Sequence, residues 1–280
     1  MTAAGGWFAD RPNHALSWLP GRGERLVVTF DNLAALRDTE NRSPWGQTFL
    51  AAQGWDVLGV MAKRNDWFRD LPLWVALEGL RDDGFFRRFG AVSMYGSSMG
   101  GFGALAFAPL SPGCTVFAMA PQSTLCQTRA PFENRYRQAR AHTDWSGPWA
   151  DAAHGIKAAG RAYIAYDPHV PQDAAHMARL IGPNVVPLAM PHLGHKLPPA
   201  LQKMKILKPL STEALSGSLT PLRFAQLFRA RHGSMPWKSD LLERARTKGH
   251  LSLARALAEK LMQDTPHWRI RHQLNALSED

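Results

Sequence analysis

One serine stands in a spacing that favours nucleophilic chemistry. Gly96, Ser98 and Gly100 form a Gly-x-Ser-x-Gly pattern, which occurs in one register only. A nucleophilic serine must project from a sharp, strained turn, so its neighbours must lack side chains that would clash. The start of a following helix would offer unpaired N–H groups to the negative charge that develops on an attacked carbonyl oxygen. The pattern therefore indicates that Ser98 attacks an acyl group.

The segments on either side of this pattern support that interpretation. Residues 91–95 are short and largely apolar, which predicts a buried strand, and residues 102–107 are small and apolar, which predicts a buried helix. Strand, tight turn and helix form the context in which the pattern has a chemical meaning. A glycine-rich turn without chemistry is the alternative. A phosphate-binding Walker loop is excluded, because no Gly-Lys-Ser/Thr follows.

The remaining elements predict a layered α/β fold. Further strands are expected at 13–19, 24–30, 55–62, 115–120, 161–166 and 183–190, and further helices at 44–53 and 71–81. Strands that alternate with helices predict parallel pairs joined by right-handed crossovers. We therefore expect a mostly parallel sheet flanked by helices.

With Ser98 in its strand–turn–helix context, residues 14–200 resemble the α/β-hydrolase family. The resemblance implies a nucleophile elbow at Ser98 and a catalytic acid in the loop after strand 161–166. The sequence Asp167-Pro-His-Val-Pro follows that strand, so Asp167 is the implied acid. Asp173 is the alternative, although an acidic residue there also suits the first turn of a helix.

The resemblance also implies a catalytic histidine in the loop after strand 183–190. His195, within a Gly-His pair, is the implied base, and His192 is the alternative. The chain order Ser98, Asp167, His195 is the order found in this family.

The family builds its oxyanion hole from two backbone N–H groups. By resemblance these are the N–H of Met99, directly after the nucleophile, and the N–H of Asn32, in the loop after strand 24–30. The usual His-Gly pair of that loop is replaced by Phe30-Asp31, and Asp31 could equally be a turn former. The implied reaction is serine hydrolysis of a carboxylic ester through an acyl-enzyme.

Two other functions stay open. The first is an acyltransferase or deacylase that acts on surface glycans, with which a basic insertion and a basic tail are compatible. The second is a non-catalytic hydrolase-like domain whose helical tail docks a partner.

The expected domain organisation is an α/β-hydrolase domain over residues 1–200 and an all-helical extension over 201–280. An insertion at about 124–160 is polar, aromatic and rich in arginine. In this family such an insertion is a cap that shapes the substrate site; a surface helix pair is the alternative. The C-terminal helices would pack on the core, on a protein partner or on a second copy of the chain.

Charge limits the partners to be expected. The chain carries 33 Lys and Arg against 23 Asp and Glu, a formal net charge of +10, and from Leu201 onward there are 14 basic against 7 acidic residues. Such a bias favours acidic partners, although a solvated helical face has the same composition. There is no run of five basic residues, so no nucleic acid is expected. No stretch of about 18 apolar residues predicts a membrane span.

The cysteine and histidine content predicts no disulfide framework and no metal. Cys114 and Cys126 are the two cysteines, and the 11 histidines are scattered without the spacing of a zinc site. The first residues lack a basic start and an apolar run, so no secretion signal is expected. These observations predict a cytoplasmic enzyme that needs no cofactor.

Overall fold

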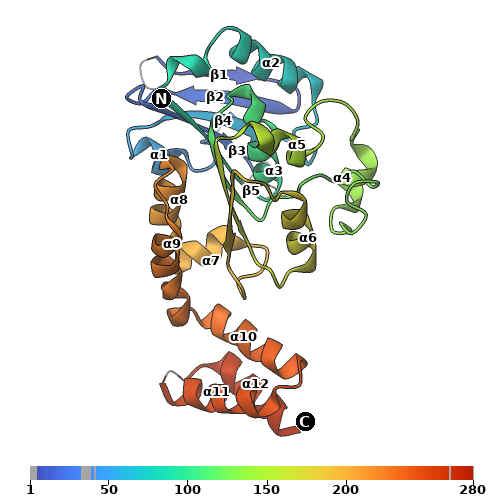
Figure 1. Ribbon diagram of the computed structural model, residues 1–280, viewed down its shortest axis with the longest axis vertical. Helices are drawn as coiled ribbons and strands as arrows, with labels where there is room; N and C mark the ends of the chain where they lie inside the picture. The colour runs from blue at the N-terminus through green and yellow to red at the C-terminus, as the bar shows by residue number, and fades with distance from the viewer. Residues whose placement is uncertain (1–4, 33–38, 41, 265, 280) are drawn as a thin grey trace.

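The computed structural model describes residues 5–32, 39–40, 42–264 and 266–279. The described residues form an eight-stranded sheet with the strand order β1-β2-β4-β3-β5-β6-β7-β8 (Figure 1). The strands are β1 (Trp7–Asp10), β2 (His14–Leu19), β3 (Arg25–Phe30), β4 (Asp56–Ala62), β5 (Ala91–Ser97), β6 (Thr115–Met119), β7 (Arg161–Tyr166) and β8 (Val185–Ala189). β1, β2 and β4 pair antiparallel, and the strands from β4 through β3 to β8 pair parallel.

Helices connect these strands and cover both faces of the sheet. They are α1 (Gln47–Ala51), α2 (Leu71–Asp82), α3 (Met99–Ala106), α4 (Arg137–His142), α5 (Ala152–Gly155), α6 (Pro171–Arg179), α7 (Leu197–Lys203), α8 (Leu207–Ser216), α9 (Pro221–Phe228), α10 (Met235–Thr247), α11 (Leu251–Asp264) and α12 (Trp268–Glu279). The prediction of a mostly parallel sheet flanked by helices is confirmed.

The β2 strand does not form a hairpin with the strand that follows it. Instead β2 runs antiparallel to β4, with His14 opposite Ala62, and β3 lies on the far side of β4. The edge strand β1, which the sequence analysis did not predict, pairs with β2. The antiparallel strands β1 and β2 therefore form one edge of the sheet, and β5, which leads to Ser98, lies in the parallel part.

Each face of the sheet carries its own apolar core. On one face α2 and α3 bury side chains such as Leu73 and Phe102 against β3 and its neighbours. On the other face α1, α7 and α8 bury side chains such as Leu50, Leu201 and Leu210 against Tyr95 and the strands around it. Burial of this many apolar groups is the main favourable term in the folding free energy.

The segment after residue 200 begins as part of the α/β unit. The Tyr95 hydroxyl lies 2.9 Å from Ser211 Oγ on α8, and Ser93 Oγ donates to the Leu215 carbonyl oxygen at 2.8 Å. The expected boundary at residue 200 therefore falls before helices that complete one core of the sheet. The separate helical core is that of α10–α12, around Leu242, Ala254, Ala258 and Ile270, and these helices lie at one end of the molecule (Figure 1).

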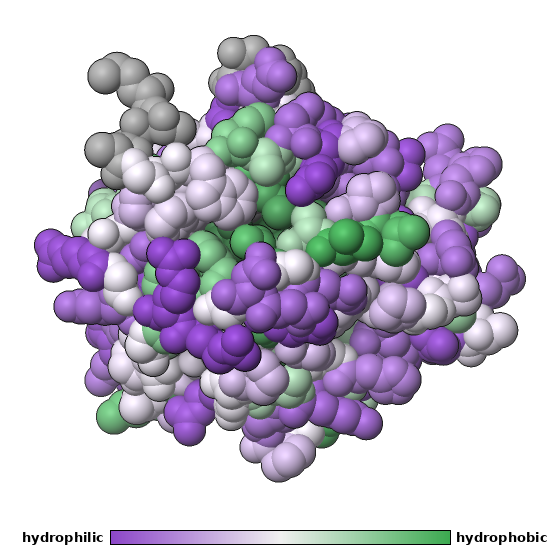
Figure 2. Space-filling view, turned by 90° about the horizontal axis from the view of Figure 1, so that it is seen from above, coloured by the Kyte–Doolittle hydropathy of each residue, from purple (hydrophilic) through white to green (hydrophobic). Residues whose placement is uncertain are grey.

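The surface at the opposite end is mostly polar. Seen from above, apolar residues gather around a hollow near the middle of this face (Figure 2), and α2 contributes the exposed side chains of Leu71 and Val75. No helix in the described part of the chain is long and apolar enough to cross a bilayer.

Two glycines allow β5, α3 and β3 to approach closely. A Cβ atom on Gly96 would lie 2.1 Å from the carbonyl oxygen of Gly100, and one on Gly100 would lie 2.3 Å from the carbonyl oxygen of Phe30. Both obstacles are backbone atoms, which cannot rotate away. Side chains at these positions would therefore separate the strand from the helix that flanks Ser98.

We predict that Gly96→Ala destabilises the protein by at least about 2 kcal/mol, because the new methyl group overlaps backbone. The matched control is Gly79→Ala on α2, where an added Cβ meets nothing within 4 Å. The unfolding free energy of that variant should rise by up to about 1 kcal/mol, since alanine has a higher helix propensity than glycine. Urea unfolding of both variants tests the prediction, which fails if the two are equally stable.

Candidate active site

Ser98 occupies a strained backbone position between β5 and α3. Its φ is 54° and its ψ is −117°, a conformation that residues other than glycine rarely adopt. The Ser98 N–H donates to the carbonyl oxygen of Met119 at the end of β6, at 2.8 Å. The turn is thus fixed by the neighbouring strand, and the hydroxyl is left to line a pocket.

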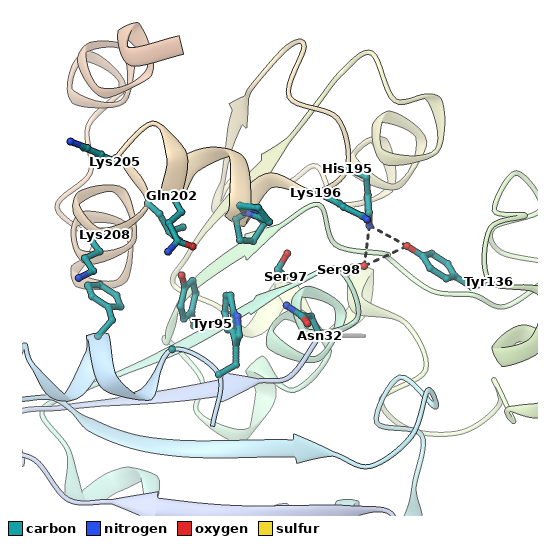
Figure 3. Close-up of a pocket in the computed structure, with 16 residues that line it drawn as sticks. Asn32, Tyr95, Ser97, Ser98, Tyr136, His195, Lys196, Gln202, Lys205 and Lys208 are labelled. Carbon is teal, nitrogen blue, oxygen red and sulfur yellow. Dashed lines mark hydrogen bonds between the residues drawn. The ribbon is translucent and has the colours of Figure 1, made fainter. Parts of the chain in front are cut away.

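A histidine and an aspartate lie next to this hydroxyl. Ser98 Oγ lies 3.0 Å from His195 Nε2, and the other ring nitrogen, Nδ1, lies 2.9 Å from Asp173 Oδ2. Figure 3 shows Ser98 and His195 facing each other at one end of the pocket. The structure therefore brings serine, imidazole and carboxylate into one hydrogen-bonded row, which is the arrangement that activates a serine hydroxyl.

Asp167, the acid implied by the resemblance, does not contact His195. Its buried carboxylate accepts hydrogen bonds from the N–H groups of His169, at 2.8 Å, and Gly194, at 2.7 Å. The expectation for Asp167 is corrected in favour of the alternative, Asp173, in the first turn of α6. Asp167 instead ties the loop that carries His195 to the end of β7.

The structure also separates the two candidate histidines. His192 Nδ1 lies 3.0 Å from Asp240 Oδ2 on α10, so its ring is directed to the C-terminal helices rather than to Ser98. Asn32 lines the same pocket as Ser98. Met99 begins α3, so its N–H is one of those that have no acceptor within the helix.

An arginine and a glutamate from the segment before α4 hold the acid in place. Arg135 Nη1 donates to Asp173 Oδ1 at 2.8 Å and lies 3.3 Å from His195 Nδ1. The same guanidinium donates to Glu133 Oε2 at 2.6 Å, and Glu133 in turn lies 3.0 Å from His176 Nε2. Two carboxylates around one guanidinium leave a net negative charge beside the imidazole.

Opposing effects act on the pKa of Glu133. Burial alone would raise it, but hydrogen bonds from His176 and Arg135 outweigh burial and lower the pKa to about 2. Charge and hydrogen bonds from Glu133 and Asp173 likewise outweigh burial and raise the pKa of Arg135. Glu133 and Arg135 are therefore both ionised throughout the neutral pH range.

A tyrosine and a glutamine also reach the reacting groups. The Tyr136 hydroxyl lies 3.4 Å from Ser98 Oγ and 3.1 Å from His195 Nε2 (Figure 3), and burial raises its pKa. Gln122 Nε2 donates to Ser98 Oγ at 3.3 Å, while Gln122 Oε1 accepts from Trp67 Nε1 at 3.0 Å. Neither Tyr136 nor Gln122 was predicted from the sequence to be part of the site. The position of Gln122 just beyond β6, at the carboxyl edge of the sheet, was a usable signal.

The pocket at this site has a volume of about 970 Å³. Its walls combine aromatic, proline and lysine side chains; the lining residues are Asn32, Trp45, Gly46, Phe49, Tyr95, Ser97, Ser98, Tyr136, His195, Lys196, Pro198, Pro199, Gln202, Lys205, Leu207 and Lys208. A mostly apolar cavity with a few convergent polar groups is typical of small-molecule sites.

A second buried cluster supports Trp67. His14 Nε2 lies 3.2 Å from Asp66 Oδ1, and His14 Nδ1 lies 3.4 Å from Asp70 Oδ2. These three residues are close enough to share a metal ion. The carboxylates, however, already accept from the N–H groups of Phe68 and Leu73, at 3.0 and 3.3 Å. The cluster therefore fits a structural role, because it fixes the turn in which Trp67 has a φ of 51°.

Several solved structures have a fold similar to that of this chain, although their sequences share little identity with it. A capsule O-acetyltransferase of Neisseria meningitidis serogroup A superposes with a TM-score of 0.51 at 13% identity, over 76% of this chain and 96% of the other. The esterase of Pyrobaculum calidifontis also has a TM-score of 0.51 at 13% identity, over 78% and 87%. Carboxyl esterase 2 of Tuber melanosporum has a TM-score of 0.50 at 12% identity, over 75% and 86%.

The chain adopts the α/β-hydrolase fold. No family model matches the sequence, and a search of curated proteins finds no relative. The α/β-hydrolase fold is therefore assigned from the sheet order, from the position of Ser98 after β5, and from the similar solved structures.

The His14 cluster predicts that stability depends on pH. Burial alone would lower the pKa of His14, but its contacts with Asp66 and Asp70 outweigh burial and raise it. The stabilising contribution of His14 to the unfolding free energy is therefore fully present below its pKa in the unfolded chain, about 6.5. It is lost as pH rises through the higher pKa in the folded protein. The difference in unfolding free energy between wild type and His14→Gln should be larger at pH 6 than at pH 9. A difference that does not change with pH contradicts the prediction.

Proposed function

We propose that this chain is a serine hydrolase that cleaves a carboxylic ester or a related acyl bond. The observation that carries the proposal is the row Ser98–His195–Asp173 at the wall of an apolar pocket, with contacts of 3.0 and 2.9 Å. In this proposal Ser98 is the nucleophile, His195 the general base and Asp173 the carboxylate that orients the imidazole, and the contact distances support these roles.

In the proposed first step, His195 Nε2 takes the proton of Ser98 Oγ as the oxygen attacks the acyl carbonyl carbon. Asp173 accepts from Nδ1–H, which fixes the tautomer and stabilises the imidazolium that forms. His195 then donates its proton to the leaving alcohol. Water enters, His195 removes its proton, and hydrolysis of the acyl-enzyme restores Ser98.

The tetrahedral oxyanion needs hydrogen-bond donors beside Ser98. We assign this role to the N–H of Met99, at the start of α3, together with the N–H of Asn32. Preorganised donors of this kind are worth roughly 3–4 kcal/mol each to the transition state.

The predicted cap, about residues 124–160, contributes side chains to the proposed site. Arg135 and Tyr136 reach Asp173 and the Ser98–His195 pair from that segment, so it shapes the site rather than only covering the surface. A role of α10–α12 in binding a partner stays a prediction.

Transfer of the acyl group to a sugar hydroxyl is a second candidate. One structural neighbour is named a capsule O-acetyltransferase, whereas others are named esterases. The two activities share the acyl-enzyme and differ only in the acceptor. Release of p-nitrophenol from an aryl ester, measured with and without a glycan acceptor, separates them: an acceptor that increases turnover and becomes acylated favours the transferase.

We predict that Ser98→Ala abolishes labelling by a fluorophosphonate probe, because the probe reacts only with an activated serine hydroxyl. Ser218→Ala, at an exposed position after α8, serves as the control and should label like wild type. The measurement is gel fluorescence after labelling, followed by mass spectrometry of the modified peptide. Undiminished labelling of Ser98→Ala would refute the assignment.

A second prediction distinguishes the two aspartates. Asp173→Asn should lower kcat for an aryl ester by about 10³- to 10⁴-fold, since the amide favours the wrong imidazole tautomer. Asp167→Asn keeps an oxygen that accepts from the Gly194 N–H, so we expect a loss of at most about tenfold and about 1 kcal/mol less stability. If Asp167→Asn proved the more damaging to kcat at equal folding, the assignment of the acid would be wrong.

A further inference from the structure

The pocket has one strongly basic end. Three of its lining residues are lysines, Lys196, Lys205 and Lys208, and no Asp or Glu occurs among the described residues that line it. All three lysines are exposed, and no described carboxylate lies within ion-pair distance of them. Clefts lined by charge of one sign concentrate ligands of the opposite sign.

Lys205 and Lys208 form this basic end, away from the reacting groups, whereas Lys196 lies next to His195. In Figure 3, Lys205 and Lys208 stand at the side of the pocket opposite to Ser98, His195 and Tyr136, and Tyr95 lies between the two groups. Trp45, Phe49 and Leu207 also line the pocket. The Tyr95 hydroxyl is engaged with Ser211, so the ring presents an apolar surface. A ligand that spans the pocket would thus meet the serine, an apolar wall and two cations.

The backbone of Lys205 has a conformation that is unusual for a lysine. The end of α7 has a Schellman geometry, in which the Lys205 N–H donates to the Gln202 carbonyl oxygen at 2.9 Å and the Ile206 N–H to the Leu201 carbonyl oxygen at 3.0 Å. The residue at this place has a φ of 60°. Glycine suits this conformation because it has no Cβ. Here a lysine accepts the strain, and its side chain lines the pocket.

We propose that Lys205 and Lys208 form a subsite for an anionic group of the substrate. The substrate class is then an acyl ester or thioester with an apolar arm that ends in a phosphate or a carboxylate. In this arrangement the scissile carbonyl lies at Ser98, the arm passes Tyr95 and Trp45, and the anion binds at the end of the pocket that Lys205 and Lys208 line. This inference rests on the proposed function for the position of the carbonyl, but anion binding itself does not require a reactive serine.

Calorimetry with octyl phosphate, octanoate, 1-octanol and inorganic phosphate tests the subsite. Octyl phosphate should bind wild type about tenfold more tightly than 1-octanol at low salt, because two lysine contacts of roughly 0.5–1 kcal/mol each are added. Salt should reduce this advantage. Octanoate and octyl phosphate show which anion the subsite favours, and inorganic phosphate shows whether the anion binds without the arm.

The variant Lys205→Gln/Lys208→Gln should lose the tenfold preference and keep its affinity for 1-octanol. The control Lys157→Gln/Lys203→Gln removes the same charge at exposed positions outside the pocket and should keep the preference. Equal binding of octyl phosphate and octanol by wild type, or an unchanged preference in Lys205→Gln/Lys208→Gln, overturns the proposal.

Lys205→Gly separates binding from folding. Glycine relieves the left-handed strain, so this variant should melt at the same temperature as wild type or higher, while its affinity for octyl phosphate falls severalfold. A lower melting temperature with unchanged affinity would show that the lysine only stabilises the turn.

The same measurements in Ser98→Ala distinguish a failed subsite from a failed reaction. If the subsite exists, Ser98→Ala still prefers octyl phosphate whether or not Ser98 is the nucleophile, and loss of the preference in that variant overturns the subsite. Undiminished fluorophosphonate labelling of Ser98→Ala overturns the proposed reaction and leaves the subsite standing. If both proposals hold, octyl phosphate also slows fluorophosphonate labelling of wild type, and does so much less in Lys205→Gln/Lys208→Gln.

Discussion

The close approach of three backbone segments governs this molecule. The first turn of α3 lies against the ends of β5 and β3 at Gly96 and Gly100, where no side chain would fit. This contact holds Ser98 at a φ of 54°, and its hydroxyl lines the pocket at the carboxyl edge of the sheet. Parallel strands end at the same edge, so the loops after β7 and β8 can deliver a carboxylate and an imidazole to one point.

The charge balance around the His195 imidazole depends on the segment before α4, which lies between β6 and β7 in the sequence. Arg135 contacts Asp173 and Glu133, and Glu133 contacts His176. A lone arginine next to Asp173 would cancel the charge that stabilises an imidazolium. The glutamate restores that charge, and the guanidinium holds both carboxylates in fixed positions. Buried ionic groups of this kind are tolerated when their hydrogen bonds are satisfied.

Local patterns were enough to predict the fold and Ser98, but not the partner of His195. Strand periodicity and the Gly-x-Ser-x-Gly spacing act over a few residues, so they could be interpreted directly. Asp167 and Asp173 both follow β7 and are both buried. Which of them faces His195 depends on how α6 sits and on where Arg135 arrives, and neither is encoded near the aspartates. The position of Tyr136 likewise depends on tertiary packing that is not encoded nearby. So does the position of α8, which packs against Tyr95 and Ser93 and belongs to a core of the sheet rather than to a separate extension.

Helices α10–α12 line no part of the pocket among the described residues, yet α10 contacts the segment that leads to His195, the proposed base. Trp237 on α10 donates to the carbonyl oxygen of Pro191, and Asp240 pairs with His192. Pro191 and His192 lie four and three residues before His195. A chain that ended after residue 234 would retain Ser98, His195 and Asp173 but would lose both attachments of this loop. The loop before His195 is therefore held both by the α/β core, through Asp167, and by α10, and a ligand that displaced α10 would loosen this loop without entering the pocket.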